Sequence, residues 1–121
     1  MMSCGCSSEK KATLIYACSG AANTGAAADQ TARLLARQRF GAMTCLAALG
    51  ADLSGFIESA KSTDENLILD GCPVACGKKI FDKLGIKNYK QVLMTELGMQ
   101  KGATPVNEEL IQELAKKIKE A

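Results

Sequence analysis

Two cysteines spaced four residues apart carry the clearest chemical signal in this chain. Cys72 and Cys76 belong to the run DGCPVAC at residues 70–76, which directly follows an apolar segment. Because proline favours the first position of a helix, we expect Cys72 to cap a helix over residues 73–84, with Cys76 in its first turn. Unpaired N–H groups at a helix start stabilise thiolates, which predicts lowered pKa values for both thiols. Such thiols suit a metal ligand and a nucleophile equally.

Two further cysteines could join this pair. Cys18 directly follows the apolar, β-branched residues 12–17, and Cys45 lies in a second apolar stretch. If residues 12–17 and 66–70 form neighbouring parallel strands, Cys18 and Cys72 lie at one rim, where open α/β sheets bind ligands. For Cys45 the spacing leaves a site role and a buried apolar role open. The chain has no histidine, so a soft-metal site here must be rich in thiolates.

The elements that must position these thiols alternate along the chain. The apolar patterns predict strands over residues 12–17, 66–70 and 89–95, and helices over residues 26–39, 53–60, 73–84 and 107–119. Residues 42–50 fit a short strand or a buried helical turn. Strands that alternate with helices predict the α/β class: a single domain with a small, mostly parallel sheet flanked by helices, layered as in Rossmann-like and flavodoxin-like folds.

Local residue types predict where several of these helices begin and end. Asp52 is placed to cap the helix at residues 53–60, and Asn107 is placed to cap the last helix. Gly85 is expected to end the helix that follows the cysteine pair.

Composition and charge narrow the class of protein. The chain has 121 residues, of which 47% are hydrophobic, and this is enough for one core-forming domain at residues 12–121. Its net charge of +2, with both signs interspersed, predicts no nucleic-acid partner and no anionic membrane partner. The polar residues 1–11 do not have the pattern of a signal peptide, and no stretch is long and apolar enough to span a bilayer. We therefore expect a cytoplasmic protein whose clustered cysteines serve metal or redox chemistry.

The loop at residues 18–25 excludes two other classes of site. Its two glycines have the spacing of a phosphate loop, but Ala26 and Ala27 stand where such a loop needs lysine and a hydroxyl residue. The loop begins with Cys18 and Ser19, as thiol phosphatases do, yet it contains no arginine to hold a phosphate.

Three motifs in order along the chain add a resemblance. They are Cys18-Ser19-Gly20, Met43-Thr44-Cys45-Leu46-Ala47, and Asp70-Gly71-Cys72-Pro73 with Cys76. With these motifs the chain resembles the DGC-domain family, from about residue 12 to the last helix. Members of that family are described as zinc-binding, and the resemblance implies a site formed by Cys18, Cys45, Cys72 and Cys76. It implies a ligand set and no particular reaction, substrate or protein partner.

Four thiolates suit tetrahedral Zn²⁺, and a site whose four positions are all filled by protein is structural or regulatory. The first hypothesis is therefore a small zinc-binding protein with a structural, regulatory or metal-handling role. Four cysteines also suit an iron–sulfur cluster. Alternatively, Cys72 or Cys18 attacks in a thiol oxidoreductase or sulfur-transfer enzyme, and another cysteine resolves. Cys4 and Cys6 could serve as an accessory arm for either chemistry or have no role.

Overall fold

Four parallel strands form the centre of the protein, which the computed structural model describes from residue 11 to residue 121. Cys4 and Cys6 lie outside the described residues. In chain order the elements are β1 (Thr13–Ala17), α1 (Asn23–Arg37), β2 (Ala42–Met43), α2 (Leu46–Gly50), α3 (Ser54–Ser62), β3 (Glu65–Asp70), α4 (Cys76–Leu84), β4 (Tyr89–Leu93), the 3₁₀ helix η2 (Met94–Leu97) and α5 (Glu108–Glu120).

The strands lie in the order β2-β1-β3-β4, and every pairing is parallel. The predicted α/β class is confirmed. β1 and β3 are direct neighbours, and their register places Ala17 opposite Leu69 at the carboxyl ends. The neighbouring strands on which the shared rim depends are therefore present.

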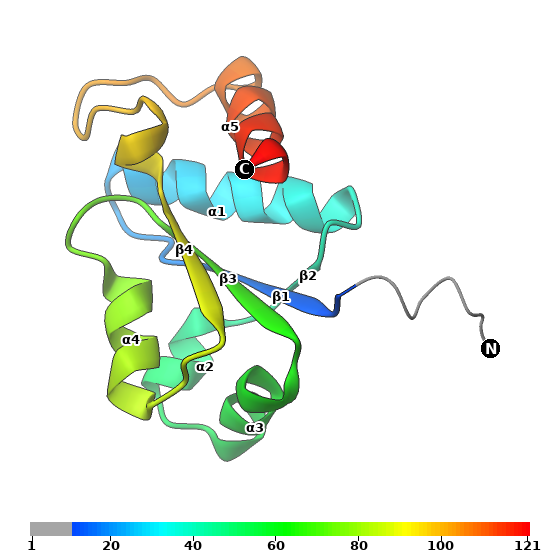
Figure 1. The fold of residues 1–121 in the computed structure, drawn as a ribbon. Helices are drawn as coiled ribbons and strands as arrows, with labels where there is room; N and C mark the ends of the chain where they lie inside the picture. The colour runs from blue at the N-terminus through cyan, green and yellow to red at the C-terminus, as the bar shows by residue number, and fades with distance from the viewer. Residues whose placement is uncertain (1–10) are drawn as a thin grey trace.

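Helices cover both faces of this sheet (Figure 1), with α1 and α5 on one face and α2, α3 and α4 on the other. The alternation of side chains along β1 explains the two layers, because Ile15 and Ala17 pack with α1 and α5, whereas Tyr16 packs with α2 and α4. Leu67 and Ile68 divide between the two layers in the same way. Both faces are buried, as expected for a parallel sheet.

Local signals placed two helix ends correctly. The Asn107 side chain accepts a hydrogen bond from the backbone N–H of Leu110 at 2.9 Å, so it caps α5 as predicted. Gly85 ends α4 with a φ of 73°, a left-handed conformation that glycine adopts at low cost.

Other boundaries differ from the predictions. Residues 42–50 contain both predicted alternatives, because β2 ends at Met43 and α2 begins at Leu46. The predicted cap at Asp52 is wrong: Leu53 is the N-cap residue of α3, and Asp52 has a φ of 65° in the turn before it. Helix α1 begins at Asn23 instead of residue 26, so its first turn includes part of the predicted loop.

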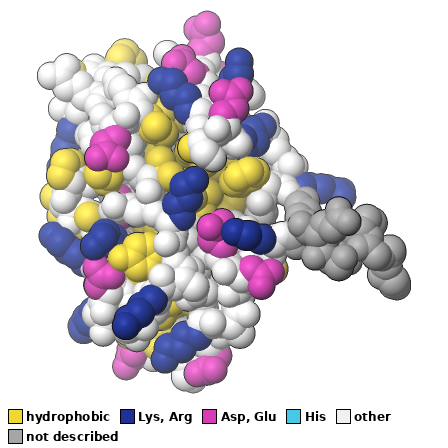
Figure 2. Space-filling view, in the orientation of Figure 1, with side chains coloured by type: hydrophobic (Ala, Val, Ile, Leu, Met, Phe, Trp, Pro, Cys, Tyr) yellow, Lys and Arg dark blue, Asp and Glu magenta, His cyan; other side chains and the backbone are white. Residues whose placement is uncertain are grey.

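The surface carries mixed charge. Figure 2 shows lysine and arginine side chains interspersed with aspartate and glutamate over the face that it presents. None of the helices in residues 11–121 combines the length and apolarity that crossing a bilayer requires.

Candidate functional site

The described cysteines gather at the carboxyl edge of three neighbouring strands. Cys18 follows β1 directly, Cys45 and Cys72 come two residues after β2 and β3, and Cys76 is the first residue of α4. All of them are free thiols. The connections that leave β1 and β3 cover opposite faces of the sheet, and ligands of open α/β sheets bind where connections diverge in this way.

Cys18 is held between the two central strand ends. Its backbone N–H donates to the carbonyl of Leu69 at 3.0 Å, which continues the β1–β3 ladder one residue past β1. Its half-buried Sγ accepts a hydrogen bond from the N–H of Gly71 at 3.3 Å. Cys18 is thus oriented by the turn that carries Cys72.

Gly71 allows this turn to approach the loop that follows Cys18. A Cβ at Gly71 would lie 2.7 Å from the carbonyl carbon of Thr24 and 2.8 Å from the nitrogen of Gly25, closer than carbon side-chain atoms pack. A Cβ at Gly25 would meet the backbone of Gly20 at 2.5 Å. The two loops are therefore in backbone contact, which explains why glycine precedes the first cysteine of the DGCPVAC run.

Cys72 lies in the turn before α4. The prediction that it caps the helix is wrong, because α4 begins at Cys76 and its N-cap residue is Ala75. The predicted direction of its pKa is confirmed with a different cause: the N–H of Val74 lowers the pKa of the Cys72 thiol, and the Lys101 ammonium adds to this effect. The Lys101 Nζ lies 3.4 Å from the Cys72 Sγ. Nothing in the chain near Cys72 indicates Lys101 as its neighbour.

Asp70 takes the capping role that was predicted for Cys72. Its carboxylate is 1% exposed and accepts hydrogen bonds from the N–H groups of Gly77 at 2.8 Å and Lys78 at 3.1 Å. The side-chain amide of Gln91 on β4 donates to the same carboxylate at 2.9 Å. Asp70 therefore fixes the first turn of α4, and with it Cys76, to the end of β3. The position of Asp70 at the end of a buried strand could have indicated this capping role from the sequence.

Two residues with left-handed backbone adjoin the cysteines. Ser19 has a φ of 52° and Ala75 a φ of 56°. Neither is glycine, and this conformation costs a residue with a Cβ about 1 kcal/mol. Ala75 delays the start of α4 until Cys76. Because of this delay, Cys72 and Cys76 do not project from one helix start, in contrast to the prediction.

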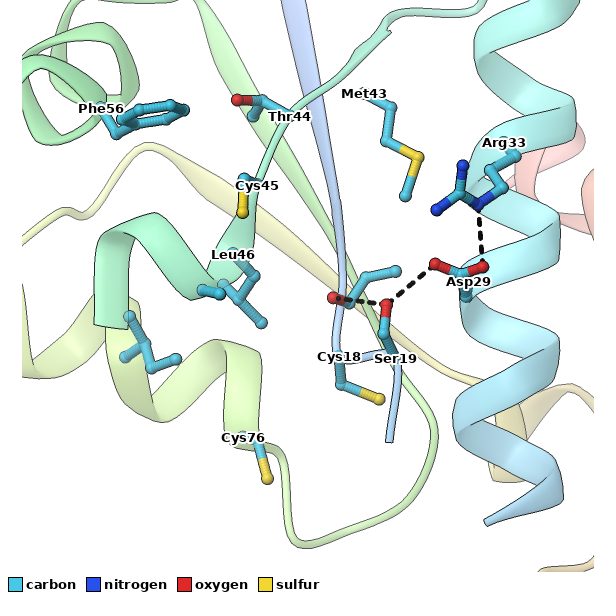
Figure 3. A pocket seen from close by; sticks show the side chains of 13 residues that line it. Cys18, Ser19, Asp29, Arg33, Met43, Thr44, Cys45, Leu46, Phe56 and Cys76 are labelled. Carbon is cyan, nitrogen blue, oxygen red and sulfur yellow. Dashed lines mark hydrogen bonds and ion pairs between the residues drawn. The ribbon is translucent and has the colours of Figure 1, made fainter. Parts of the chain in front are cut away.

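Two cavities share the thiols. The larger, of about 760 Å³, is lined by Cys18, Cys45 and Cys76. In Figure 3 these side chains come from three segments: the end of β1, the residue before α2 and the start of α4. The smaller cavity, of about 330 Å³, is lined by Cys18, Cys72, Cys76 and Lys101. Cys18 and Cys76 line both cavities, so the two cavities adjoin at these two residues.

A chain of hydrogen bonds between Ser19 in the loop after β1 and two residues of α1 borders the larger cavity, and it was not predicted from the sequence. The hydroxyl of Ser19 donates to the Asp29 carboxylate at 3.0 Å, and the Nε of Arg33 donates to the same carboxylate at 2.9 Å (Figure 3). The hydrogen bond from Arg33 is the main reason why the pKa of Asp29 is lowered. Asp29 and Arg33 have the four-residue spacing of a helical ion pair, and this spacing could have indicated the pair from the sequence.

The donor types fit a thiophilic metal ion, because four free thiols lie along one edge without histidine. Within residues 11–121, however, no three cysteine, histidine, aspartate or glutamate side chains already stand close enough together to hold a metal ion. A metal would have to draw the thiols together. The four-cysteine ligand set thus stays a prediction.

The comparison with protein families identifies the chain's relatives. The model of the DGC domain matches residues 14–118, which include all four described cysteines. The chain belongs to the DGC-domain family. It is similar to the "Anaerobic and virulence modulator AnvM" of Pseudomonas aeruginosa, with 34% identity over 88 residues, 73% of this chain and 67% of AnvM. No solved structure matches.

Proposed function

We propose that this chain is a small cytoplasmic regulatory protein that binds Zn²⁺ through Cys18, Cys45, Cys72 and Cys76. Membership of the DGC-domain family and the similarity to a protein named as a modulator support a regulatory role. The observation that carries the proposal is the placement of the four thiols in the segments that follow three neighbouring strands, at one edge of the sheet.

The chemistry of the donor set favours zinc over harder cations. Thiolates are soft ligands that select zinc, copper(I) or iron–sulfur clusters, whereas Mg²⁺ and Ca²⁺ prefer oxygen. Four cysteine ligands would leave no open position on Zn²⁺, which suits a structural or regulatory site. Four thiolates around Zn²⁺ carry a net charge of about −2, and the Gly71 N–H and the Lys101 ammonium are placed to offset it.

Metal analysis of protein purified without oxygen tests this proposal. We expect about one zinc per chain and no visible absorption, because Zn²⁺ has a filled d shell. Visible charge-transfer bands together with bound iron would indicate an iron–sulfur cluster in place of zinc. Single serine substitutions at the four cysteines should each lower the zinc content sharply.

The matched control replaces both cysteines outside the described residues. The double variant Cys4→Ser/Cys6→Ser removes two thiols and leaves the proposed ligands intact, so its zinc content should equal that of the wild type. Unchanged zinc content in Cys18→Ser, Cys45→Ser, Cys72→Ser and Cys76→Ser would refute the ligand set. A loss of zinc in the control variant would indicate that Cys4 or Cys6 contributes to the zinc site.

A second candidate is thiol redox chemistry, favoured by the environment of Cys72. The Val74 N–H and Lys101 lower the pKa of its thiol, which favours the thiolate form that attacks a disulfide. Cys18 borders the same cavity and is the candidate resolving thiol. Protein that is purified without metal and forms a reversible Cys18–Cys72 disulfide would favour this function over zinc binding.

A further inference from the structure

The larger cavity has an apolar wall, a thiol edge and one oriented cation. Met43, Leu46, Phe56 and Ile80 supply apolar surface, and Cys18, Cys45 and Cys76 supply thiols. Arg33 borders the same space from α1 (Figure 3). A cleft of about 760 Å³ with apolar walls and a few polar groups has the size and composition of small-molecule sites.

Arg33 is oriented by the protein and keeps donors for a ligand. Its Nε donates to Asp29, and Asp29 is itself held by the hydroxyl of Ser19. Within the described residues Asp29 is the recorded partner of Arg33, and the Arg33 side chain is 61% exposed. Its terminal NH₂ groups therefore remain available. A guanidinium offers paired donors that match the two oxygens of a carboxylate.

We propose that this cleft binds an acidic low-molecular-weight disulfide, with a ligand carboxylate on Arg33 and the ligand disulfide at a cleft thiol. The inference rests on the cysteine edge of the proposed function, but it places the reaction at Cys18, Cys45 or Cys76, which line this cavity, and not at Cys72. A cleft Sγ, as thiolate, attacks one ligand sulfur, so that a protein–ligand S–S bond forms and the ligand S–S bond breaks. The other half of the ligand leaves as a thiolate and takes up a proton from water. The cysteine is oxidised to the mixed disulfide as this half is reduced to a thiol.

Two disulfides that differ in charge test the role of Arg33. Oxidised glutathione carries carboxylates as well as ammonium groups, whereas cystamine carries ammonium groups and no carboxylate. The protein as purified, with its zinc content measured on the same sample, is exposed to each compound, and the mixed disulfides are followed by intact mass and peptide mapping. The variant Arg33→Met keeps the apolar stem and removes the guanidinium.

The matched control is Arg37→Met, one turn further along α1. Arg37 borders a groove between α1 and α5 and not the thiol cavity, and its loss changes the net charge equally. We expect Arg33→Met to slow modification by oxidised glutathione about tenfold, because one charge-assisted contact is lost. Modification by cystamine should not slow. Arg37→Met should behave as the wild type with both compounds.

The outcomes separate this inference from the proposed function. Equal slowing by Arg33→Met and Arg37→Met, or modification that maps to Cys72 instead of Cys18, Cys45 or Cys76, would overturn the inference. Arg33→Met leaves every proposed zinc ligand in place, so its zinc content should match the wild type. If the protein binds zinc but Arg33→Met affects the two disulfides equally, the inference is refuted and the zinc site is not. If the protein distinguishes the two disulfides without binding zinc, only the zinc site is refuted.

Discussion

The thiols at the strand ends and the thiols at the helix starts differ in how the protein holds them. Cys18 and Cys72 are half-buried, and their sulfurs accept hydrogen bonds from the N–H of Gly71 and the Nζ of Lys101. Cys45 and Cys76 are exposed, and no hydrogen bond to either sulfur is recorded in the described part of the chain. The protein thus orients the first pair itself and leaves the second pair to be oriented by what binds.

Backbone packing accounts for this difference. The loops after β1 and β3 touch through Gly71 and Gly25, so polar hydrogens of one loop reach the sulfur of the other. Cys45 precedes α2 and Cys76 begins α4, two helices whose apolar sides pack on the sheet, and both cysteines line the larger cavity. A metal or ligand that brings the four thiols together has to recruit mainly the second pair.

The largest effect is expected from removing the carboxylate that fixes α4 to β3. Asp70→Ala leaves the N–H groups of Gly77 and Lys78 without their acceptor in a buried place, and should lower the free energy of unfolding by about 3 kcal/mol. Urea denaturation measures this value. Cys76 should also be alkylated faster, because the first turn of α4 is no longer anchored. Asp70→Asn keeps one oxygen acceptor and should lose less stability, and a cost below about 1 kcal/mol for Asp70→Ala would contradict the anchoring role.

A smaller effect is expected from separating the two touching loops. In Gly71→Ala the new methyl group overlaps the backbone of Thr24 and Gly25, and the unfolding free energy should fall by about 2 kcal/mol. Cys18 should become more accessible to alkylation, which would reduce its difference from Cys45. The matched control is Gly55→Ala in α3, where a Cβ meets nothing within 4 Å. It should stabilise the protein by about 0.5 kcal/mol. Equal behaviour of the two variants in urea denaturation would show that the loop contact is unimportant.

The sequence predicted those features that depend on neighbouring residues. Alternation of apolar strands and helices was sufficient for the α/β class, and Asn107 and Gly85 act on backbone within a few residues of themselves. The placement of Cys18 beside the Cys72 turn followed from the parallel sheet, since both residues come after neighbouring strands.

The start of α4 could not be predicted from Pro73 alone. The preference of proline for the first helical turn is a local effect, whereas Asp70 and the left-handed Ala75 determine where the helix begins. Lys101 reaches Cys72 from the loop between η2 and α5, and nothing in its own sequence context marks it. Such contacts arise only once the chain has folded.

The smallest effect is expected for the pH dependence of Cys72 alkylation. The N–H of Val74 stabilises the Cys72 thiolate most and Lys101 adds a smaller effect, so the pKa of Cys72 lies below that of an ordinary thiol. Cys72 should therefore react at lower pH than an ordinary thiol. Lys101→Met removes the ammonium and should raise this pKa without restoring the ordinary value, because the Val74 N–H remains. At neutral pH the rate of alkylation of Cys72 should fall about twofold, the scale of an exposed charge contact. At a pH where thiols are fully ionised the rate should not change.

Peptide mapping after alkylation with iodoacetamide follows each thiol separately. Lys79→Met, on the exposed side of α4, removes an equal charge without a contact to Cys72 and serves as the control. Within residues 11–121 no hydrogen bond reaches the Cys45 sulfur, so its rate of alkylation should be the same in the wild type and both variants. If Lys101→Met changed Cys45 and Cys72 equally, the effect would be one of net charge, and the strand-end thiol would not be individually tuned.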